Sequence, residues 1–342
     1  MTAVQDHATT GHTISANGAS PAEKAKDRRV LAILIGLAML GLLAITAYLT
    51  YGVQGSWSYA LSLRSRQVGS LIVVGIAIGA SSLVFQTIAG SRILTPGVMG
   101  FDAVYVLIQT MIVGLFGAST LQLLGVMERF ALNTFALMIF GLLLFRFLFR
   151  SNSRNLFVVV LVGIVLGSLF ASLSTLTSRL LSPDDFLTLQ TVLFASFTTV
   201  DPVLLGVTGA ATAFGLLALW PQLRKLDVVD LGHDGCVALG VDYHRTVRTT
   251  LVIVTLLVAA STALVGPMIF LGLIVANLAR QALPTHRHTS LVVASALIGL
   301  LFTVGGQFLV THVFDLQTPI SVVINLVGGL YFIVLLLRTD RL

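Results

Sequence analysis

Long apolar runs constrain this chain more than any other feature of its sequence. Residues 31–50 contain no Asp, Glu, Lys or Arg, and about 20 apolar residues can cross the roughly 30 Å hydrocarbon core of a bilayer as an α-helix. Nine further predominantly apolar runs follow, and the sequence therefore predicts an all-α integral membrane protein with about ten transmembrane helices. The runs cover residues 31–50, 68–88, 98–118, 130–149, 156–175, 202–220, 249–265, 268–283, 291–311 and 320–337.

The composition agrees with this class of protein. Apolar residues make up 56% of the 342 residues and charged residues only 10%, whereas a soluble domain carries about 25% charged residues. So few charges could not cover the surface of a soluble protein of this size. The single cysteine, Cys236, excludes an intrachain disulfide framework.

The basic residues indicate the orientation. Ten spans place both termini on one side of the membrane, and only four of the 20 Lys and Arg fall on the other side: Arg64, Arg66, Arg129 and Arg179. Cytoplasmic loops carry the excess of Lys and Arg, so we expect a multi-pass protein of a bacterial cytoplasmic membrane with both termini in the cytoplasm. This distribution also accounts for the net charge of +6; lipid is the expected partner, and nucleic acid is not.

The polar segments outside the spans divide the chain. Residues 1–29 are predicted to be a disordered cytoplasmic tail, ahead of a transmembrane permease domain over 30–342. The run 31–50 is longer than the apolar region of a signal peptide, and no clear small-x-small cleavage site follows it. We therefore favour a retained helix over a cleaved signal peptide.

Two connections carry local signals. Outside, Ser182 precedes Pro183 and two acidic residues, a pattern that starts a helix, and we expect a short amphipathic helix over 184–197. Inside, residues 221–248 form the longest cytoplasmic connection, and Gly232, Gly235 and Gly240 divide it into two short helical pieces.

Sequence motifs for catalysis and metal binding are absent. The chain has no Gly-Lys dipeptide and hence no Walker A loop, and it has neither a His-Glu-x-x-His motif nor paired cysteines. We expect no enzyme activity of its own, no cofactor and no metal site. His286 and His288 suggest a metal site at first sight, but a solvated loop is the simpler interpretation.

Few ionisable groups lie deep inside the spans. Asp102 is the exception, about one turn into the third run; it fits either a proton or sodium relay or a hydrogen bond to backbone groups at a re-entrant turn. The spacings Gly75-x-x-x-Gly79 and Gly163-x-x-x-Gly167 predict close helix packing.

Four stretches, in this order, carry a family resemblance. They are Val74-Gly75 through Phe85-Gln86, Arg92-Ile93-Leu94-Thr95-Pro96-Gly97-Val98-Met99-Gly100-Phe101-Asp102, residues 226–241 with Ala238-Leu239-Gly240-Val241, and Val265-Gly266-Pro267-Met268-Ile269-Phe270-Leu271-Gly272-Leu273. Together they resemble the permease subunits of FecCD-type ABC importers of ferric siderophores, haem or vitamin B12. The resemblance covers roughly residues 30–340.

Two departures narrow the resemblance. Most members have Val-Pro-His where this chain has Val275-Ala276-Asn277, and an Asn-Pro turn where it has Arg92-Ile93-Leu94-Thr95-Pro96. Both variants resemble the branch that includes catecholate-type siderophore permeases, such as those for petrobactin.

The resemblance implies an iron(III)-siderophore permease with several partners. They are two ABC ATPase subunits, a second permease subunit that is the same or a sister chain, and an extracytoplasmic siderophore-binding protein. The chelator supplies the ligands of the iron, so charges along the path are not required.

The sequence suggests three groups of site residues. Irregular backbone at membrane depth must be surrounded by protein or a water cavity, so the turn that breaks the helix is predicted to line the translocation path. Apolar residues in a cytoplasmic loop need a partner, and they are predicted to contact the ATPase. Arg64 and Arg66 are either interfacial anchors or, as the resemblance suggests, contacts for acidic residues of the binding protein. The path group is Thr95, Pro96, Gly97, Gly100 and Asp102, and the coupling group is Leu231, Gly232, Ala238, Leu239, Gly240 and Val241.

Two other classes stay open. An ion-coupled secondary transporter would keep its uptake after ATP depletion while the ion gradient persists. An intramembrane enzyme would need an activated nucleophile, and the nearest candidates, Ser172, Ser174, Thr175 and Thr177, have no His or paired acid in the spans.

Overall fold

The computed structural model describes residues 21–52, 56–117, 119, 125–150, 156–194, 197, 200–314 and 318–339. All regular structure in these residues is helical. In chain order the helices are α1 (Pro21–Thr50), α2 (Trp57–Ala89), η1 (Gly97–Met99), α3 (Phe101–Phe116), α5 (Val126–Arg150), α6 (Leu156–Ser178), α7 (Pro183–Leu193), α8 (Pro202–Val229), α9 (Gly232–Ala238), α10 (Tyr243–Val265), α11 (Leu271–Ala282), α12 (His288–Leu300), η2 (Leu301–Gly305), α13 (Gly306–Phe308), η3 (Leu309–Val313) and α14 (Ile320–Thr339).

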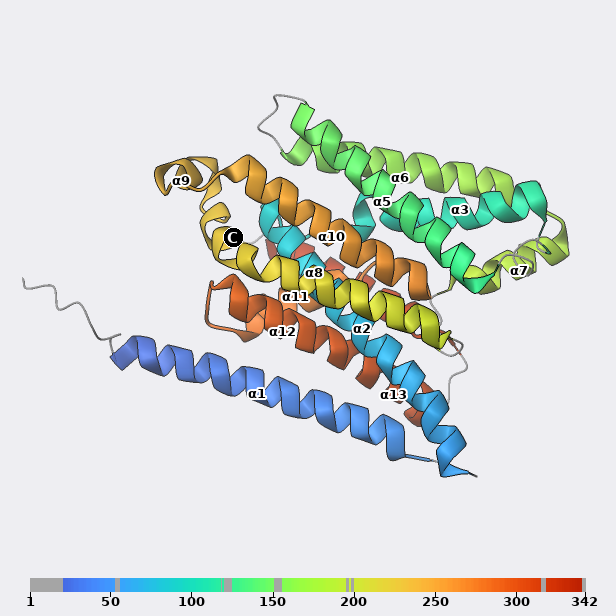
Figure 1. Cartoon of the computed structure of the whole chain (residues 1–342), viewed down its shortest axis with the longest axis horizontal. Helices are drawn as coiled ribbons and strands as arrows, with labels where there is room; N and C mark the ends of the chain where they lie inside the picture. Colours follow the sequence, from blue (N-terminus) through green and yellow to red (C-terminus); the bar gives the residue numbers. More distant parts are fainter. Residues whose placement is uncertain are drawn as a thin grey trace, which may run out of the picture.

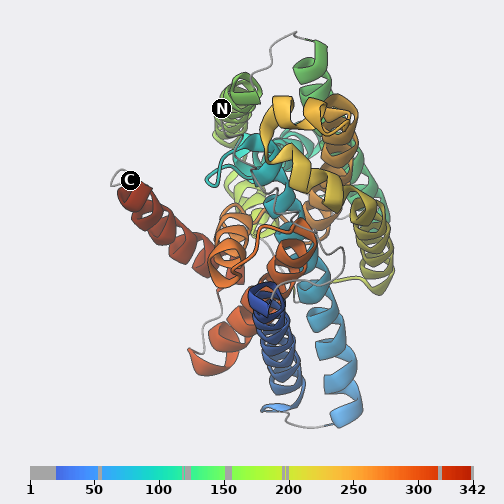
Figure 2. The ribbon, with the colours of Figure 1, turned by 90° about the vertical axis from the view of Figure 1, so that its left-hand side faces the viewer.

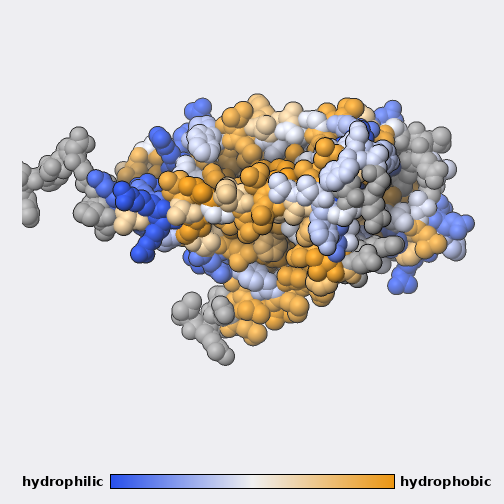
Figure 3. Space-filling model, turned by 90° about the horizontal axis from the view of Figure 1, so that it is seen from below, coloured by the Kyte–Doolittle hydropathy of each residue, from blue (hydrophilic) through white to orange (hydrophobic). Residues whose placement is uncertain are grey.

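The prediction of an all-α membrane protein is confirmed. Each of the ten apolar runs falls on a helix, and within the described residues seven helices are long and apolar enough to cross a membrane. The run 291–311 forms one rod, in which the π-helical turns η2 and η3 flank the short α13. The long helices run side by side (Figure 1), and hydrophilic residues gather toward both ends of an apolar middle (Figure 3).

The two ends of the bundle differ, and they are named here by the short helix that each carries. The α9 end holds α9 and the start of α1, and the α7 end lies opposite (Figure 1). The expected outer helix is present as α7, and the Ser182 hydroxyl accepts a hydrogen bond from the backbone N of Asp185 at 3.2 Å. It ends at Leu193 rather than at residue 197.

Two predicted boundaries are wrong. Helix α1 begins at Pro21, so residues 21–29 belong to a helix and not to the polar tail; residues 1–20 lie outside the described residues. The predicted span 202–220 ends too early, because residues 221–229, expected as a separate short helical piece, prolong α8. Pro221 costs the helix one hydrogen bond, but Leu223 and Leu226 beyond it are fully buried against the bundle and keep the helix going.

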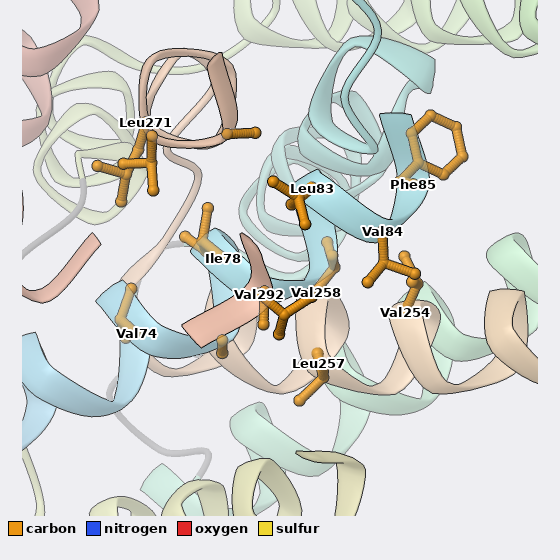
Figure 4. Packing of buried hydrophobic residues seen from close by; sticks show 14 of the residues in the cluster. Val74, Ile78, Leu83, Val84, Phe85, Val254, Leu257, Val258, Leu271 and Val292 are labelled. Atoms are coloured by element: carbon orange, nitrogen blue, oxygen red, sulfur yellow. The ribbon is translucent and has the colours of Figure 1, made fainter. Parts of the chain in front are cut away.

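Helix α2 lies at the centre of the bundle, where it packs against α8, α10, α11 and α12. Its apolar side chains, among them Val84 and Leu83, meet those of α10 and α12 (Figure 4). Helix α14, by contrast, packs mainly on α11 and extends away from the other helices (Figure 2).

Glycines bring α2 and α12 into backbone contact. A methyl group added at Gly75 would lie 2.7 Å from the carbonyl carbon and oxygen of Gly299, and one added at Gly79 would lie 2.5 Å from the carbonyl oxygen of Ser295. The Ser295 hydroxyl donates to the carbonyl oxygen of Gly79 at 2.7 Å. Gly75 and Gly79 therefore let α2 and α12 approach closely and form a hydrogen bond across the contact, as small residues do between membrane helices.

The α2–α12 contact can be tested with a matched pair of alanines. Gly75→Ala should lower the stability of the purified protein by about 1–3 kcal/mol, because the extra methyl group has no room. Gly36→Ala on α1 is the control, since a methyl group there meets nothing within 4 Å. Thermal unfolding in detergent should show a lower Tm for Gly75→Ala only; equal Tm values for the two variants would contradict the packing.

Candidate functional site

The segment between α2 and α3 is an irregular turn held by side-chain amides. Helix α2 ends at Gly90 in the left-handed conformation (φ 60°). Beyond it, Gln86 Nε2 and Asn277 Nδ2 both donate to the carbonyl oxygen of Arg92, at 2.9 and 2.8 Å. A carbonyl that no helix satisfies thus has two side-chain donors, one from α2 and one from α11. Asn277 and Arg92 belong to the two stretches that depart from the family pattern, and these stretches are in direct contact.

The turn continues through η1 to Gly100, at a position that accepts only glycine. Gly100 has φ 101°, and a methyl group on it would lie 3.1 Å from the Cα of Gly167 on α6. Gly163 likewise faces Met99, whose carbonyl oxygen a methyl group there would approach to 3.1 Å. The second glycine pair therefore packs α6 against the turn.

A cavity of about 660 Å³ lies beside the turn, between α3, α6 and α7. Gly97, Gly100 and Asp102 line it together with small and hydroxyl residues of α6, including Gly167 and Ser168. The predicted path residues Thr95 and Pro96 are buried and are not among its lining residues. The structure thus brings three of the five predicted path residues to one cavity.

Asp102 lies in the first turn of α3 and is buried. Its Oδ2 has no hydrogen-bond partner within the part of the chain that the structure describes, so the expected bond to freed backbone groups is not formed by that atom. A methyl group at Gly97 would lie 2.7 Å from Oδ2, which keeps residue 97 small.

The predicted coupling residues gather at the tip of the α9 end. Left-handed glycines flank α9, Gly232 with φ 87° and Gly240 with φ 70°. Leu231 and Leu239 are 67% and 61% exposed, and Val237 between them is 64% exposed. We call these three side chains the α9 patch.

The other apolar residues of the predicted coupling segment face inward or lie beside the patch. Leu226 and Val229 are buried in the core, and Val241 is half-buried against it. Ala238 is exposed. The apolar surface offered to a partner is therefore narrower than the sequence pattern suggested.

The two arginines before α2 have different surroundings. Arg64 donates through Nη1 to the carbonyl oxygens of Tyr48 and Tyr51 at 3.1 and 2.6 Å. Its guanidinium thus closes the C-terminal end of α1, where free carbonyls favour a cation. Arg66 is exposed. Sequence reasoning treated the two as equivalent, but the structure shows Arg64 bound to its own chain.

His288 is not in a solvated loop, so that interpretation is wrong for this residue. Its side chain is fully buried at the start of α12. The ring lies between Asp227 Oδ1, 2.7 Å from Nδ1, and Thr87 Oγ1, 2.8 Å from Nε2. His286, two residues earlier, is exposed as expected.

Sequence reasoning also missed the polar residues that hold the turn. Gln86 and Asn277 are buried, and Arg280 follows on α11. Their signal was an amide or a cation within a turn or two of the end of an apolar run, where it looks like an ordinary helix end. Only the packing of α2 against α11 shows that Gln86 and Asn277 share the carbonyl oxygen of Arg92 and that Arg280 donates to Thr87.

Comparison with known proteins identifies the family. The FecCD transport family matches residues 29–338. The chain belongs to the FecCD transport family. It is 39% identical to the petrobactin import system permease protein YclO of Bacillus subtilis (strain 168), over 92% of this chain and 99% of that protein. It is 33% identical to the petrobactin import system permease protein FatC of Bacillus anthracis, over 97% and 95%.

A solved structure has the same fold. The chain superposes with a TM-score of 0.79 on a putative metal-chelate type ABC transporter in an inward-facing conformation, at 21% identity and over 90% of this chain and 99% of that one. This member of the FecCD family is thus a multi-pass membrane transport subunit, and the matched family domain carries no Walker A loop.

The cavity can be tested by cysteine labelling. Ser168→Cys should react with a membrane-impermeant thiol reagent faster than Leu169→Cys, because Ser168 lines the cavity whereas Leu169 is exposed elsewhere on α6. Wild-type protein gives a low background, since Cys236 is buried and burial raises the pKa of its thiol. Equal labelling of the two variants would show that the cavity is closed to water.

Proposed function

We propose that this chain is the permease subunit of an ABC importer that carries an iron(III)-siderophore complex of the petrobactin type across a bacterial cytoplasmic membrane. The observation that carries the proposal is the identity of 39% and 33% to two petrobactin import permeases over almost the whole chain. Energy must come from partner ATPases, because the chain has no nucleotide-binding loop of its own.

The charges support an orientation with the α9 end in the cytoplasm. The start of α1 carries Arg28 and Arg29, and further pairs of basic residues lie near the end of α8 and the start of α10. The α7 end has few cations, and Arg66 is one of them. By the positive-inside rule, both termini then lie in the cytoplasm, and the α7 end faces the extracytoplasmic binding protein.

The cavity beside the turn supports a translocation path. It extends from Phe186 on α7 to Gly97 in the turn, along α6, most of whose surface is exposed. A second permease subunit against α6 would close the open side. The lining is mostly small and uncharged, which suits a bulky chelate that already surrounds its iron.

The α9 patch supports ATPase coupling. Three neighbouring apolar side chains at the tip of a water-facing segment need a partner to cover them, and a short helix that inserts into a groove of another protein is a common solution. The glycines on both sides of α9 fix the angle at which it projects.

A substitution in the α9 patch tests the coupling. Leu239→Asp should prevent co-purification of the ATPase and abolish uptake, since it places a charge in the apolar contact. Leu187→Asp is the control for ATPase co-purification, which it should leave unchanged: this leucine on α7 is about as exposed, at 64%, but lies at the opposite end. ATPase association that survives Leu239→Asp together with full uptake would show that α9 does not receive the ATPase.

The substrate is tested by uptake of radioactive iron in cells. A strain that lacks this permease should lose uptake of iron supplied as ferric petrobactin and keep uptake of iron supplied as a hydroxamate chelate. A plasmid copy of the gene should restore the lost uptake. Unchanged uptake of ferric petrobactin, or loss of both kinds of uptake, would contradict the proposed substrate.

A further inference from the structure

Four side chains near the α9 end connect four different helices through one buried and two partly buried contacts. Asp227 on α8 lies 2.7 Å from His288 Nδ1 on α12, and His288 Nε2 lies 2.8 Å from Thr87 Oγ1 on α2. Arg280 Nη2 on α11 donates to the same Thr87 hydroxyl at 2.7 Å. We call Asp227, His288, Thr87 and Arg280 the polar chain.

The Asp227 end of the polar chain has a defined direction. A carboxylate can only accept, so His288 donates from Nδ1 to Asp227, and its backbone N donates to the same oxygen at 2.7 Å. Asp227 therefore also satisfies the first N–H of α12, which no residue of α12 itself can do. A carboxylate and a guanidinium stand at the two ends, and hydrogen bonds to charged groups are the strong ones.

One end of the polar chain reaches the coupling segment. Asp227 is in the last turn of α8, which ends at Val229 and leads directly to Leu231 and α9. The side chain of Asp227 is 35% exposed, whereas that of His288 is 1% exposed. A displacement of α9 would therefore reach the last turn of α8, where Asp227 contacts His288.

The other end reaches the turn beside the cavity. Gln86 precedes Thr87 on α2, and Asn277 lies one turn before Arg280 on α11. Both donate to the carbonyl oxygen of Arg92. Helices α2 and α11 thus meet at Thr87 and also hold Arg92, where the segment to Gly97 and Gly100 at the cavity begins.

We propose that the polar chain links the α9 patch to the turn at the cavity, so that Asp227, His288, Thr87 and Arg280 are positioning residues of transport. The inference rests on the proposed function, in which α9 receives the movement of the ATPase. When α9 moves, α8 must either carry α12 and α2 with it or break bonds that have little water to replace them. In both cases the packing that holds Arg92 changes, and with it the turn.

The decisive variant removes one hydroxyl and keeps the shape of the side chain. Thr87→Val leaves His288 and Arg280 without their common partner, whereas Thr87→Ser retains it. Thr250→Val is the matched control, because Thr250 is fully buried on α10 and its Oγ1 has no hydrogen-bond partner among the described residues. All three are compared with wild type in proteoliposomes that contain the ATPase and the binding protein.

The measured quantities are ATP hydrolysis and chelate transport, taken separately. Thr87→Val should keep ATPase association and hydrolysis but lower the chelate transported per ATP by roughly tenfold, the factor expected for one hydrogen bond to a charged group. Thr87→Ser and Thr250→Val should keep the wild-type ratio. ATP should also change the labelling rate of Ser168→Cys in the wild-type background and no longer change it with Thr87→Val.

Three results would contradict the inference. If Thr87→Val transports as much chelate per ATP as wild type, the inference fails while the proposed function stands. The same holds if Thr87→Val and Thr250→Val lose transport per ATP equally. Absence of ATP-driven transport by the wild-type assembly would overturn the proposed function and the inference with it. If Thr87→Val does not fold, Asp227→Ala replaces it, since Asp227 lies at the surface end of the polar chain, and the same ratio decides.

Discussion

The backbone contact between α2 and α12 fixes the helix on which the rest of this structure depends. Because Gly75 and Gly299 have no side chains, the two helices approach until their backbones touch, and the Ser295 hydroxyl of α12 donates across the contact to the carbonyl oxygen of Gly79 at 2.7 Å. With α2 held in the centre, its last turn is in place to present Gln86 and Thr87. Gln86 holds the carbonyl of Arg92 in the turn, and Thr87 is part of the polar chain.

The structure separates the place where energy would enter from the place where the chelate would pass. The α9 patch is at one tip of the bundle, and the cavity lies beside α6, where Gly100 packs on Gly167. The polar chain runs from the last turn of α8 to α11 and connects the helices near the α9 end. Such groups are costly unless they are paired, and in the polar chain each of them bonds to the next helix.

Much of the fold follows from the sequence, and the misses have physical reasons. Apolar runs predict spans because a bilayer leaves a helix few alternatives. They do not predict where a helix continues into water, and so α1 begins at Pro21, and α8 passes Pro221 on the strength of buried Leu223 and Leu226. Gly97 and Gly100 were found because they interrupt a helix at membrane depth, and Gly100 has a left-handed φ of 101°. The roles of Arg64 and His288 were not predicted from the sequence, because each side chain bonds to atoms of another helix that only packing brings near.

ATP dependence of transport in a purified system tests the central claim most directly. The permease is reconstituted with its ATPase, and the binding protein and ferric petrobactin are supplied on the side of the α7 end. Uptake should require ATP at the α9 end and should persist when an ionophore abolishes every ion gradient. Uptake that runs without ATP and stops with the ionophore would contradict the account and identify an ion-coupled transporter.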